Sequence, residues 1–333
     1  MAIRPIDVHD DAELHRFHEI CWRAEMEDGR PWNSFQSIEE MTAFLRNPSP
    51  GRRATPIGIF DGEEMVGGGM VQASLEDNLE KAFVHACVEP DRRGHGIGGE
   101  LLAGLVEHAR ELGRTELMSG ASYRFEEREN APVLRFVARH GFSPAHLEVV
   151  RECPLPVADA LLDKIDAEVA EHAEGFVVQT FVDEVPTELE ESYCWLIGQL
   201  ALDAPTGDLD FEAEAFTPEA LHHDMARDKM TGRTVVRSIA TLDGQAVAHS
   251  DLMVRANGDL RAHQWGTLVH REHRGHRLGA AVKSANLRWL QRERPEVTVV
   301  STQNAEVNEQ MIGINARLGF APVALVPEFL RRV

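Results

Sequence analysis

The chain carries the same glycine- and arginine-rich segment twice, and this duplication restricts its possible folds more than any other feature. The first copy spans residues 92–101 (RRGHGIGGEL) and the second spans residues 273–282 (HRGHRLGAAV), 181 positions later. A Gly-Phe pair follows each copy, at 141–142 and at 319–320, 178 positions apart. Two independent landmarks with nearly the same offset are typical of a duplicated domain. The sequence therefore predicts one fold used twice.

Each half alternates predicted strands and helices in a similar order. In the first half, apolar periodicity predicts strands at 3–6, 55–60, 64–73, 81–88, 116–119 and 147–151, and helices at 11–26, 38–45, 101–112 and 131–140. In the second half it predicts strands at 235–242, 245–254, 259–269, 297–302 and 322–326, and helices behind the second signature and at 308–318. Gly29 and Pro31 are expected to end the first helix. We expect an N-terminal domain at 1–155, a connecting helix or linker at 156–175 and a C-terminal domain at 176–333.

Composition argues against several classes of function. The 333 residues include 55 acidic and 34 basic side chains, and the net charge of −21 argues against a nucleic-acid partner, which needs basic patches. The charge suits a cationic substrate, and it suits equally an acidic surface that only keeps the chain soluble. The four cysteines form no CxxC pair and no cluster with histidine, so no metal is expected. Neither a targeting segment nor a membrane helix is visible, which predicts a cytoplasmic protein.

The first signature has the features of a phosphate site. A strand that ends at Val88 and passes through a glycine-rich loop into a helix presents free backbone N–H groups and the positive end of the helix dipole. Glycines at 94, 96, 98 and 99 keep side chains away from a phosphate, and Arg93 adds a positive charge. A tight turn that merely favours glycine is the alternative. The dinucleotide fingerprint GxGxxG also matches here, but the second copy loses it.

With these residues the chain resembles the GNAT family, the general-control-related N-acetyltransferases, whose acetyl-coenzyme A loop reads Q/R-x-x-G-x-G/A. In the first copy Arg93, Gly96 and Gly98 fill the specified positions, whereas Arg277 replaces the middle glycine of the second copy. The tandem arrangement is similar to actinobacterial two-domain acetyltransferases, including mycothiol-synthase-like proteins. The resemblance implies an α/β (α+β) fold of two GNAT-like domains, each with a mixed, mostly antiparallel central sheet flanked by helices.

The resemblance also implies which residues bind acetyl-coenzyme A. In the first domain these are Cys87, Val88, Arg93, Gly94, His95, Gly96, Ile97, Gly98, Gly99 and Asn130. In the second domain they are Leu268, Val269, Arg274, Gly275, His276, Arg277, Leu278, Gly279, Asn304 and Asn308. The first domain, with the complete motif, is the better candidate for coenzyme binding.

The chemistry that the resemblance implies is direct attack of an amine on the thioester, with both substrates bound together. A base must take a proton from the amine, and in many family members a tyrosine four residues before the Gly-Phe pair protonates the departing thiolate. That position holds Val137 in the first copy and Asn315 in the second. We predict His263 as the base, with Asp251 on the neighbouring strand and Asn315 at the position of that tyrosine as further catalytic candidates, and His85 as the alternative polar group in the first domain. Each histidine is also compatible with a purely structural role.

The sequence thus predicts an N-acetyltransferase that moves an acetyl group from acetyl-coenzyme A to a primary amine of a small molecule. The expected partner is that amine, without nucleic acid or membrane, in a monomer or homodimer. The missing tyrosines leave open an alternative, an acyl-coenzyme A-binding or scaffold protein in which one or both domains are not catalytic.

Overall fold

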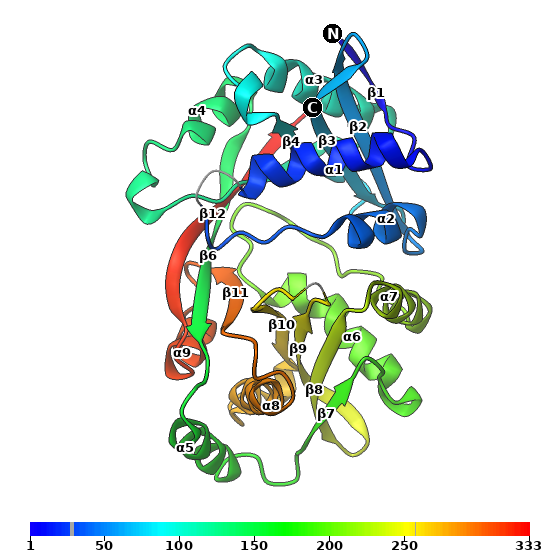
Figure 1. Ribbon diagram of the computed structural model, residues 1–333. Helices are drawn as coiled ribbons and strands as arrows, with labels where there is room; N and C mark the ends of the chain where they lie inside the picture. The colour runs from blue at the N-terminus through cyan, green and yellow to red at the C-terminus, as the bar shows by residue number, and fades with distance from the viewer. Residues whose placement is uncertain (27–29, 257) are drawn as a thin grey trace. The chain divides into compact units, whose positions relative to one another are not determined.

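The computed structural model describes residues 1–26, 30–256 and 258–333 (Figure 1). Gly29, which was expected to end the first helix, lies outside these residues. The chain forms two compact units. The first unit contains Met1–Leu147, Gly207–Asp210 and Ala324–Val333, and the second contains Glu148–Thr206 and Phe211–Val323. Both ends of the chain therefore lie in the first unit.

The elements of the first unit follow the order expected from the sequence. They are β1 (Ala2–Pro5), α1 (Asp11–Met26), α2 (Ile38–Arg46), β2 (Arg52–Asp61), β3 (Glu64–Ser74), β4 (Lys81–Val88), the 3₁₀ turn η1 (Pro90–Arg92), α3 (Ile97–Glu111), β5 (Glu116–Gly120), the 3₁₀ turn η2 (Phe125–Glu127) and α4 (Pro132–Arg139). Neighbouring strands from β1 to β4 are antiparallel, and β4 and β5 are parallel. The mixed, mostly antiparallel sheet is confirmed.

Helices cover both faces of this sheet. On one face α1 and α2 pack against β3 through an apolar cluster that includes Phe17, Met41 and Met70. On the other face α3 packs Leu101 and Leu105 against the sheet. Each of these side chains is at most 9% exposed, and burying a side chain of this size contributes about 1.5–3 kcal/mol. The two layers fix β4 between them, with alternate side chains facing opposite helices.

The second unit repeats this arrangement. Its elements are α5 (Asp159–Ala170), β7 (Val177–Val182), α6 (Thr187–Asp203), α7 (Pro218–Thr231), β8 (Thr234–Leu242), β9 (Gln245–Val254), β10 (Arg261–Val269), the 3₁₀ turn η3 (Arg271–His273), α8 (Leu278–Glu293), β11 (Val299–Ala305) and α9 (Glu309–Arg317). Neighbouring strands from β7 to β10 are antiparallel, whereas β10 and β11 are parallel. The helix α7 was not predicted; Thr217 caps its first turn and Pro218 begins it.

The closing strands depart from the expectation that each repeat completes its own sheet. The strand β6 (Ser143–Pro154) begins in the first unit, but its residues 148–154 pair antiparallel with β11 in the second unit. The strand β12 (Ala321–Arg332) begins in the second unit, and its Glu328–Arg332 segment pairs antiparallel with β5 in the first unit. Single-sequence periodicity identifies such strands but carries no information about their partners. The boundaries 1–155, 156–175 and 176–333 remain a prediction of how the repeats divide the sequence.

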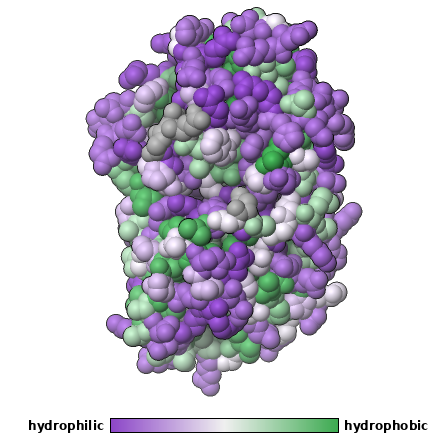
Figure 2. All heavy atoms as spheres, in the orientation of Figure 1, coloured by the Kyte–Doolittle hydropathy of each residue, from purple (hydrophilic) through white to green (hydrophobic). Residues whose placement is uncertain are grey.

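Hydrophilic residues cover most of the face in Figure 2, with apolar ones scattered among them. Single exposed apolar side chains are normal on protein surfaces. Within the described part of the chain, helices suited in length and hydropathy to crossing a bilayer are absent.

Candidate active site

The first signature forms a tight loop between β4 and α3. Gly94 and Gly96 adopt left-handed backbone conformations, with φ of +82° and +86°. A Cβ at either position would meet no atom within 4 Å, so glycine is favoured here for its backbone conformation. Gly96 is the N-cap of α3 and provides no side-chain hydrogen bond to the first turn. The N–H groups of that turn therefore point out of the helix without a capping side chain, which suits an anion.

The other two glycines of the first signature serve packing. A Cβ on Gly99 would lie 2.9 Å from a ring carbon of His140, and one on Gly98 would lie 3.5 Å from the ring of Phe136. Both partners belong to the segment around α4, so these glycines let α3 approach it closely. The guanidinium of Arg93 donates to the backbone oxygens of Val88 (3.3 Å) and Ala24 (3.2 Å), which joins the loop to β4 and α1.

The second signature forms the same kind of loop with a different residue at its key position. Arg277, where the first copy has Gly96, is the N-cap of α8 with φ of +58°, and Gly275 has φ of +91°. The backbone conformation is therefore kept without the middle glycine, although a left-handed arginine costs about 1–2 kcal/mol. The sequence could not predict this, because a non-glycine residue rarely adopts that conformation.

The basic side chains of the second loop are paired with acidic residues of their own unit. Asp203, at the end of α6, accepts from Arg271 at 2.5 Å and from Arg274 at 2.7 Å. Glu168 of α5 pairs with Arg277 at 3.3 Å and also with Arg317. The side chain of Asp203 is only 5% exposed, whereas those of Arg271 and Arg274 are 60% and 43% exposed.

The connecting segment also lies against the second loop. The ring of His276 interacts through Nδ1 with the backbone oxygen of His172, 2.8 Å away, and its ring centroid is 5.0 Å from that of Phe176. Acidic residues and an aromatic ring therefore lie where an incoming phosphate would need cations. Sequence reasoning missed Glu168 and Asp203 because both are distant in the chain from the loop.

Strand β4 has an open backbone edge beside the first loop. Its parallel pairing with β5 covers Lys81, Ala82 and Phe83, whereas its pairing with β3 continues to Val88. In the described residues, β4 is thus paired on one side only from 84 to 88. In the second unit, β10 pairs with β11 from Arg261 to Gln264, and its register with β9 shifts after Gln264. Diverging parallel strands leave N–H and C=O groups available to a ligand.

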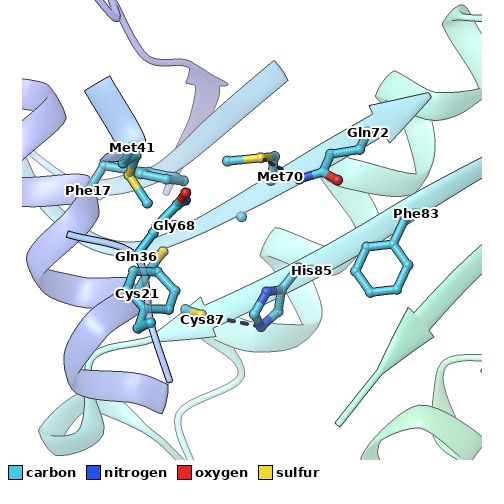
Figure 3. Close-up of a pocket in the computed structure, with 12 residues that line it drawn as sticks. Phe17, Cys21, Gln36, Met41, Gly68, Met70, Gln72, Phe83, His85 and Cys87 are labelled. Carbon is cyan, nitrogen blue, oxygen red and sulfur yellow. Dashed lines mark hydrogen bonds between the residues drawn. The ribbon is translucent and has the colours of Figure 1, made fainter. Parts of the chain in front are cut away.

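A cavity of about 100 Å³ lies on the α1 side of β4 (Figure 3). The side chains of His85 and Phe83 point toward it from β4, on either side of the position where β4 and β5 part. Its lining is mostly apolar and comes from α1, α2 and the segment before it, β3 and β4: Phe17, Cys21, Phe35, Gln36, Met41, Gly68, Gly69, Met70, Gln72, Phe83, His85 and Cys87. The open edge of β4 and this cavity therefore share one stretch of strand.

Two residues of the cavity wall, His85 and Cys87, meet a third chemically active group, Glu25, which is not part of the lining. The Nε2 atom of His85 lies 3.1 Å from Oε1 of Glu25 and 3.6 Å from Sγ of Cys87. Glu25 is held from its other side, because Nδ2 of Asn33 donates to Oε2 at 3.1 Å. Ser122 in turn donates to Oδ1 of Asn33 at 2.6 Å. Sequence reasoning found His85 but missed Glu25, which lies 60 positions away.

These groups strongly affect one another's protonation. The Cys87 sulfur and the Glu25 carboxylate outweigh burial and raise the pKa of His85 well above its usual value. Burial alone would raise the pKa of Glu25, but His85 and Arg30 hold it below its ordinary value. A hydrogen bond with Cys21, together with burial, raises the pKa of the Cys87 thiol. The three groups therefore form one coupled cluster, in which each side chain shifts the pKa of its neighbours.

The predicted catalytic residues of the second unit lie in separate surroundings. Asp251 is buried on β9 and accepts from the hydroxyl of Tyr193 at 2.9 Å. Asn315 is fully buried on α9 and donates to Oδ1 of Asn304 at 3.0 Å, an atom that also accepts from Arg151. His263 lies on β10, paired with Met253 and Ser301 of the neighbouring strands. Asp251 and Asn315 thus belong to different networks, and the catalytic role of all three stays a prediction.

The outlying residues predicted to bind coenzyme have simpler positions. Asn130 is exposed just before α4, and its backbone N–H donates to Glu127. Asn308 caps α9, where its side chain accepts from the N–H of Met311 at 3.1 Å. Asn304 is buried on β11 next to Asn315. Structural hydrogen bonds account for the positions of Asn304 and Asn308, and their binding to a coenzyme stays a prediction.

Comparisons with known proteins agree with this geometry. Residues 13–142 match the family model described as the acetyltransferase (GNAT) family. This stretch of the first unit is therefore similar to a GNAT-family acetyltransferase domain. A solved tandem GNAT protein from the clavulanic acid biosynthesis pathway is 25% identical, with a TM-score of 0.77 over 99% of this chain and 98% of that one. The tandem GNAT fold therefore extends over the whole chain.

A second solved structure has the same fold at lower identity. The GCN5-related N-acetyltransferase from Sphaerobacter thermophilus is 18% identical, with a TM-score of 0.64 over 99% of this chain and 95% of that one. A search among curated proteins found no significant match. The similarity to the GNAT family and the tandem GNAT fold support acyl transfer in general terms.

Proposed function

We propose that this protein transfers an acetyl group from acetyl-coenzyme A to a primary amine of a small molecule. The observation that carries the proposal is the common location of three features in the first GNAT domain. These are the uncapped N-terminus of α3 behind Gly96, the open edge of β4 and the cavity beside His85. A phosphate site, an unpaired strand edge and an acceptor cavity together supply what acyl transfer from a coenzyme requires.

The residues of the first loop fit the coenzyme. The backbone N–H groups that follow Gly96 would hold its pyrophosphate, and the open edge of β4 would take the thioester arm. The coenzyme supplies an activated thioester carbonyl for attack by the amine, with both substrates bound at once. In the second domain, Asp203 and Glu168 already pair with the basic residues of the loop. We therefore propose that the first domain binds the coenzyme and that the second supports it.

The cavity favours a small acceptor with an apolar body. Phenylalanine and methionine side chains make up five of its twelve lining residues, and its volume of about 100 Å³ accommodates only a few heavy atoms. The amine of such a substrate would lie toward His85 and Glu25. The carboxylate of Glu25, oriented by Asn33 and His85, is our candidate to accept the proton that the amine loses. This assignment differs from the sequence-based prediction of His263.

An acetyl-transfer assay with a panel of small amines tests the proposal. We expect turnover that depends on acetyl-coenzyme A and that favours short apolar amines over polycationic ones. Glu25→Gln should lower kcat by about 100-fold, within the range usual for general bases, with a smaller effect on coenzyme affinity. His263→Ala, made in parallel, tests the second domain. If His263→Ala abolishes turnover and Glu25→Gln does not, catalysis belongs to the second domain.

A further inference from the structure

The ligand atoms of Glu25, His85 and Cys87 have the arrangement of a metal site. Oε1 of Glu25, a ring nitrogen of His85 and Sγ of Cys87 all lie within 4.8 Å of one another. Carboxylate, imidazole and thiolate are the three ligand types of protein-bound zinc. Only His85 and Cys87 are close together in the sequence, because Glu25 lies 60 positions before His85. A short sequence motif therefore could not reveal the cluster.

The separations match those between the ligands of a tetrahedral zinc ion. With zinc–ligand bonds of about 2.0–2.3 Å and tetrahedral angles, nitrogen and oxygen lie roughly 3.3 Å apart, and nitrogen and sulfur roughly 3.5 Å apart. The observed distances are 3.1 Å from His85 to Glu25 and 3.6 Å from His85 to Cys87. Two of the three ligand pairs therefore have the separations expected around zinc, and the atoms of the third pair, Glu25 and Cys87, lie within 4.8 Å of each other.

A single nitrogen faces both partners, which also favours a shared ion. Nε2 of His85 carries either one hydrogen or one lone pair, yet it faces Glu25 and Cys87 at once. One hydrogen cannot make two linear hydrogen bonds, so this contact is poorer than two separate bonds. An ion placed between the three atoms would use the nitrogen lone pair, a carboxylate oxygen and the sulfur together.

The residues around the cluster orient its ligands and leave it accessible to an ion, as a metal site requires. Oε2 of Glu25 is held by Asn33, and Asn33 by Ser122, a chain of outer partners that orients Oε1 toward His85. The side chain of His85 is 38% exposed and that of Glu25 is 23% exposed, so an ion can enter. The cavity lies next to His85 and Cys87 and leaves room for a fourth ligand (Figure 3).

A second group in the chain makes a useful contrast. His270, Glu272 and His273 also have ligand atoms within 4.8 Å of one another, but they lie on the short turn η3. There Nδ1 of His270 already accepts from the backbone N–H of Glu272. This group contains no cysteine and lies outside the cavity lining of the first unit.

We propose that Glu25, His85 and Cys87 form a binding site for a thiophilic divalent cation, zinc in particular, with its fourth position open to the acceptor cavity. Magnesium and calcium are disfavoured because they prefer sets of oxygen ligands. An ion held there occupies the polar end of the cavity, so zinc inhibits acetyl transfer. The binding itself does not depend on the proposed function.

Cobalt titration of the full chain, stripped of metal with a chelator, tests the site. We expect one Co²⁺ per chain, with the tetrahedral visible bands and the thiolate-to-cobalt charge-transfer band, and displacement by Zn²⁺. Cys87→Ser should abolish the charge-transfer band. His85→Gln should keep the band but weaken binding at least about tenfold, a loss that even outer-shell changes produce. Cys194→Ser, which removes a buried cysteine of the second unit, is the matched control.

Two results would overturn the site: a wild-type chain without the charge-transfer band, or a Cys87→Ser chain that keeps it. The His85→Gln variant covers the possibility that Cys87→Ser fails to fold, because its thiol remains. Failure of the proposed function is distinguishable, since no coenzyme or amine enters the titration. Zinc binding without inhibition of transfer would leave the site intact and remove the acceptor cavity from the reaction.

Discussion

Burial shifts the pKa of individual side chains in this protein in ways that their sequence positions do not indicate. Lys283 of α8 is 1% exposed, and its Nζ has Met311 Sδ at 3.9 Å and the ring of Phe320 at 5.4 Å. Burial lowers the pKa of Lys283 to about 7, with a small opposing effect from Cys153. A lysine on a helix behind a glycine loop looks like a surface residue in the sequence. Only packing reveals that this ammonium group lies in the core.

Lys283→Met is expected to stabilise the protein, most strongly at low pH. Below about pH 7 the lysine is charged in both folded and unfolded chains, so the full cost of burying the charge is present. Between about pH 7 and pH 10.4 only the unfolded chain binds the proton, and the stability of the wild type rises with pH. The gain should reach at most about 4 kcal/mol at pH 6 and shrink by pH 9.

Urea unfolding at pH 6 and pH 9 measures this difference. Lys229→Met, at an exposed position of α7, is the control and should change stability by less than about 0.5 kcal/mol. An equal gain from Lys283→Met at both pH values would mean that the buried lysine is not the titrating group.

At the scale of elements, the two signature loops share a backbone and differ in their neighbours. Gly94 and Gly275 occupy matching left-handed positions, and a Cβ at either would meet no atom within 4 Å. Asp203 of α6 and Glu168 of α5 pair with Arg274 and Arg277 of the second loop. In the first loop Arg92 pairs with Glu64 of β3, whereas Arg93 donates to backbone oxygens. Ion pairs already made within the protein must break before Arg274 and Arg277 can bind a phosphate.

Calorimetric titration should therefore give one acetyl-coenzyme A per chain. Gly94→Asp places a carboxylate in the first loop and should weaken binding about 10- to 100-fold, the effect of about 1.4–2.8 kcal/mol. Gly275→Asp introduces the same side chain under nearly the same backbone strain, and we expect it to change affinity less than twofold. Two sites in the wild type, or equal losses in both variants, would show that both loops bind.

At the scale of the whole molecule, the last strand of the chain completes the first unit. Residues 328–332 of β12 pair with β5, and Phe329 is fully buried in the cluster that holds α3 against the sheet. The residue belongs to the second repeat by sequence, yet its side chain supports the helix that follows the first signature loop. In this protein the repeats of the sequence and the compact units of the fold do not coincide at their last strands.

Phe329→Ala should destabilise the first unit by about 3–5 kcal/mol, the usual cost of truncating a buried phenylalanine. The variant should also lower coenzyme affinity, because α3 loses part of its support. Val326→Ala, at a partly exposed position of the same strand, is the control and should cost less. Thermal unfolding with and without acetyl-coenzyme A measures both effects, and an unchanged affinity would contradict the link between β12 and the loop.

Local pattern alone determined the duplication, most of the strands and helices and the first glycine-rich loop, because these depend on residues close together in the chain. Strand β4, for example, was predicted with its observed bounds, and the family resemblance of its loop was confirmed. The tertiary structure decided which strands pair, that Asp203 and Glu168 neutralise the second loop, and that Glu25 meets His85 and Cys87. Such contacts join residues that are distant in the chain, some of them more than a hundred positions apart. Sequence periodicity reports which side of an element is buried, whereas only packing chooses what it is buried against.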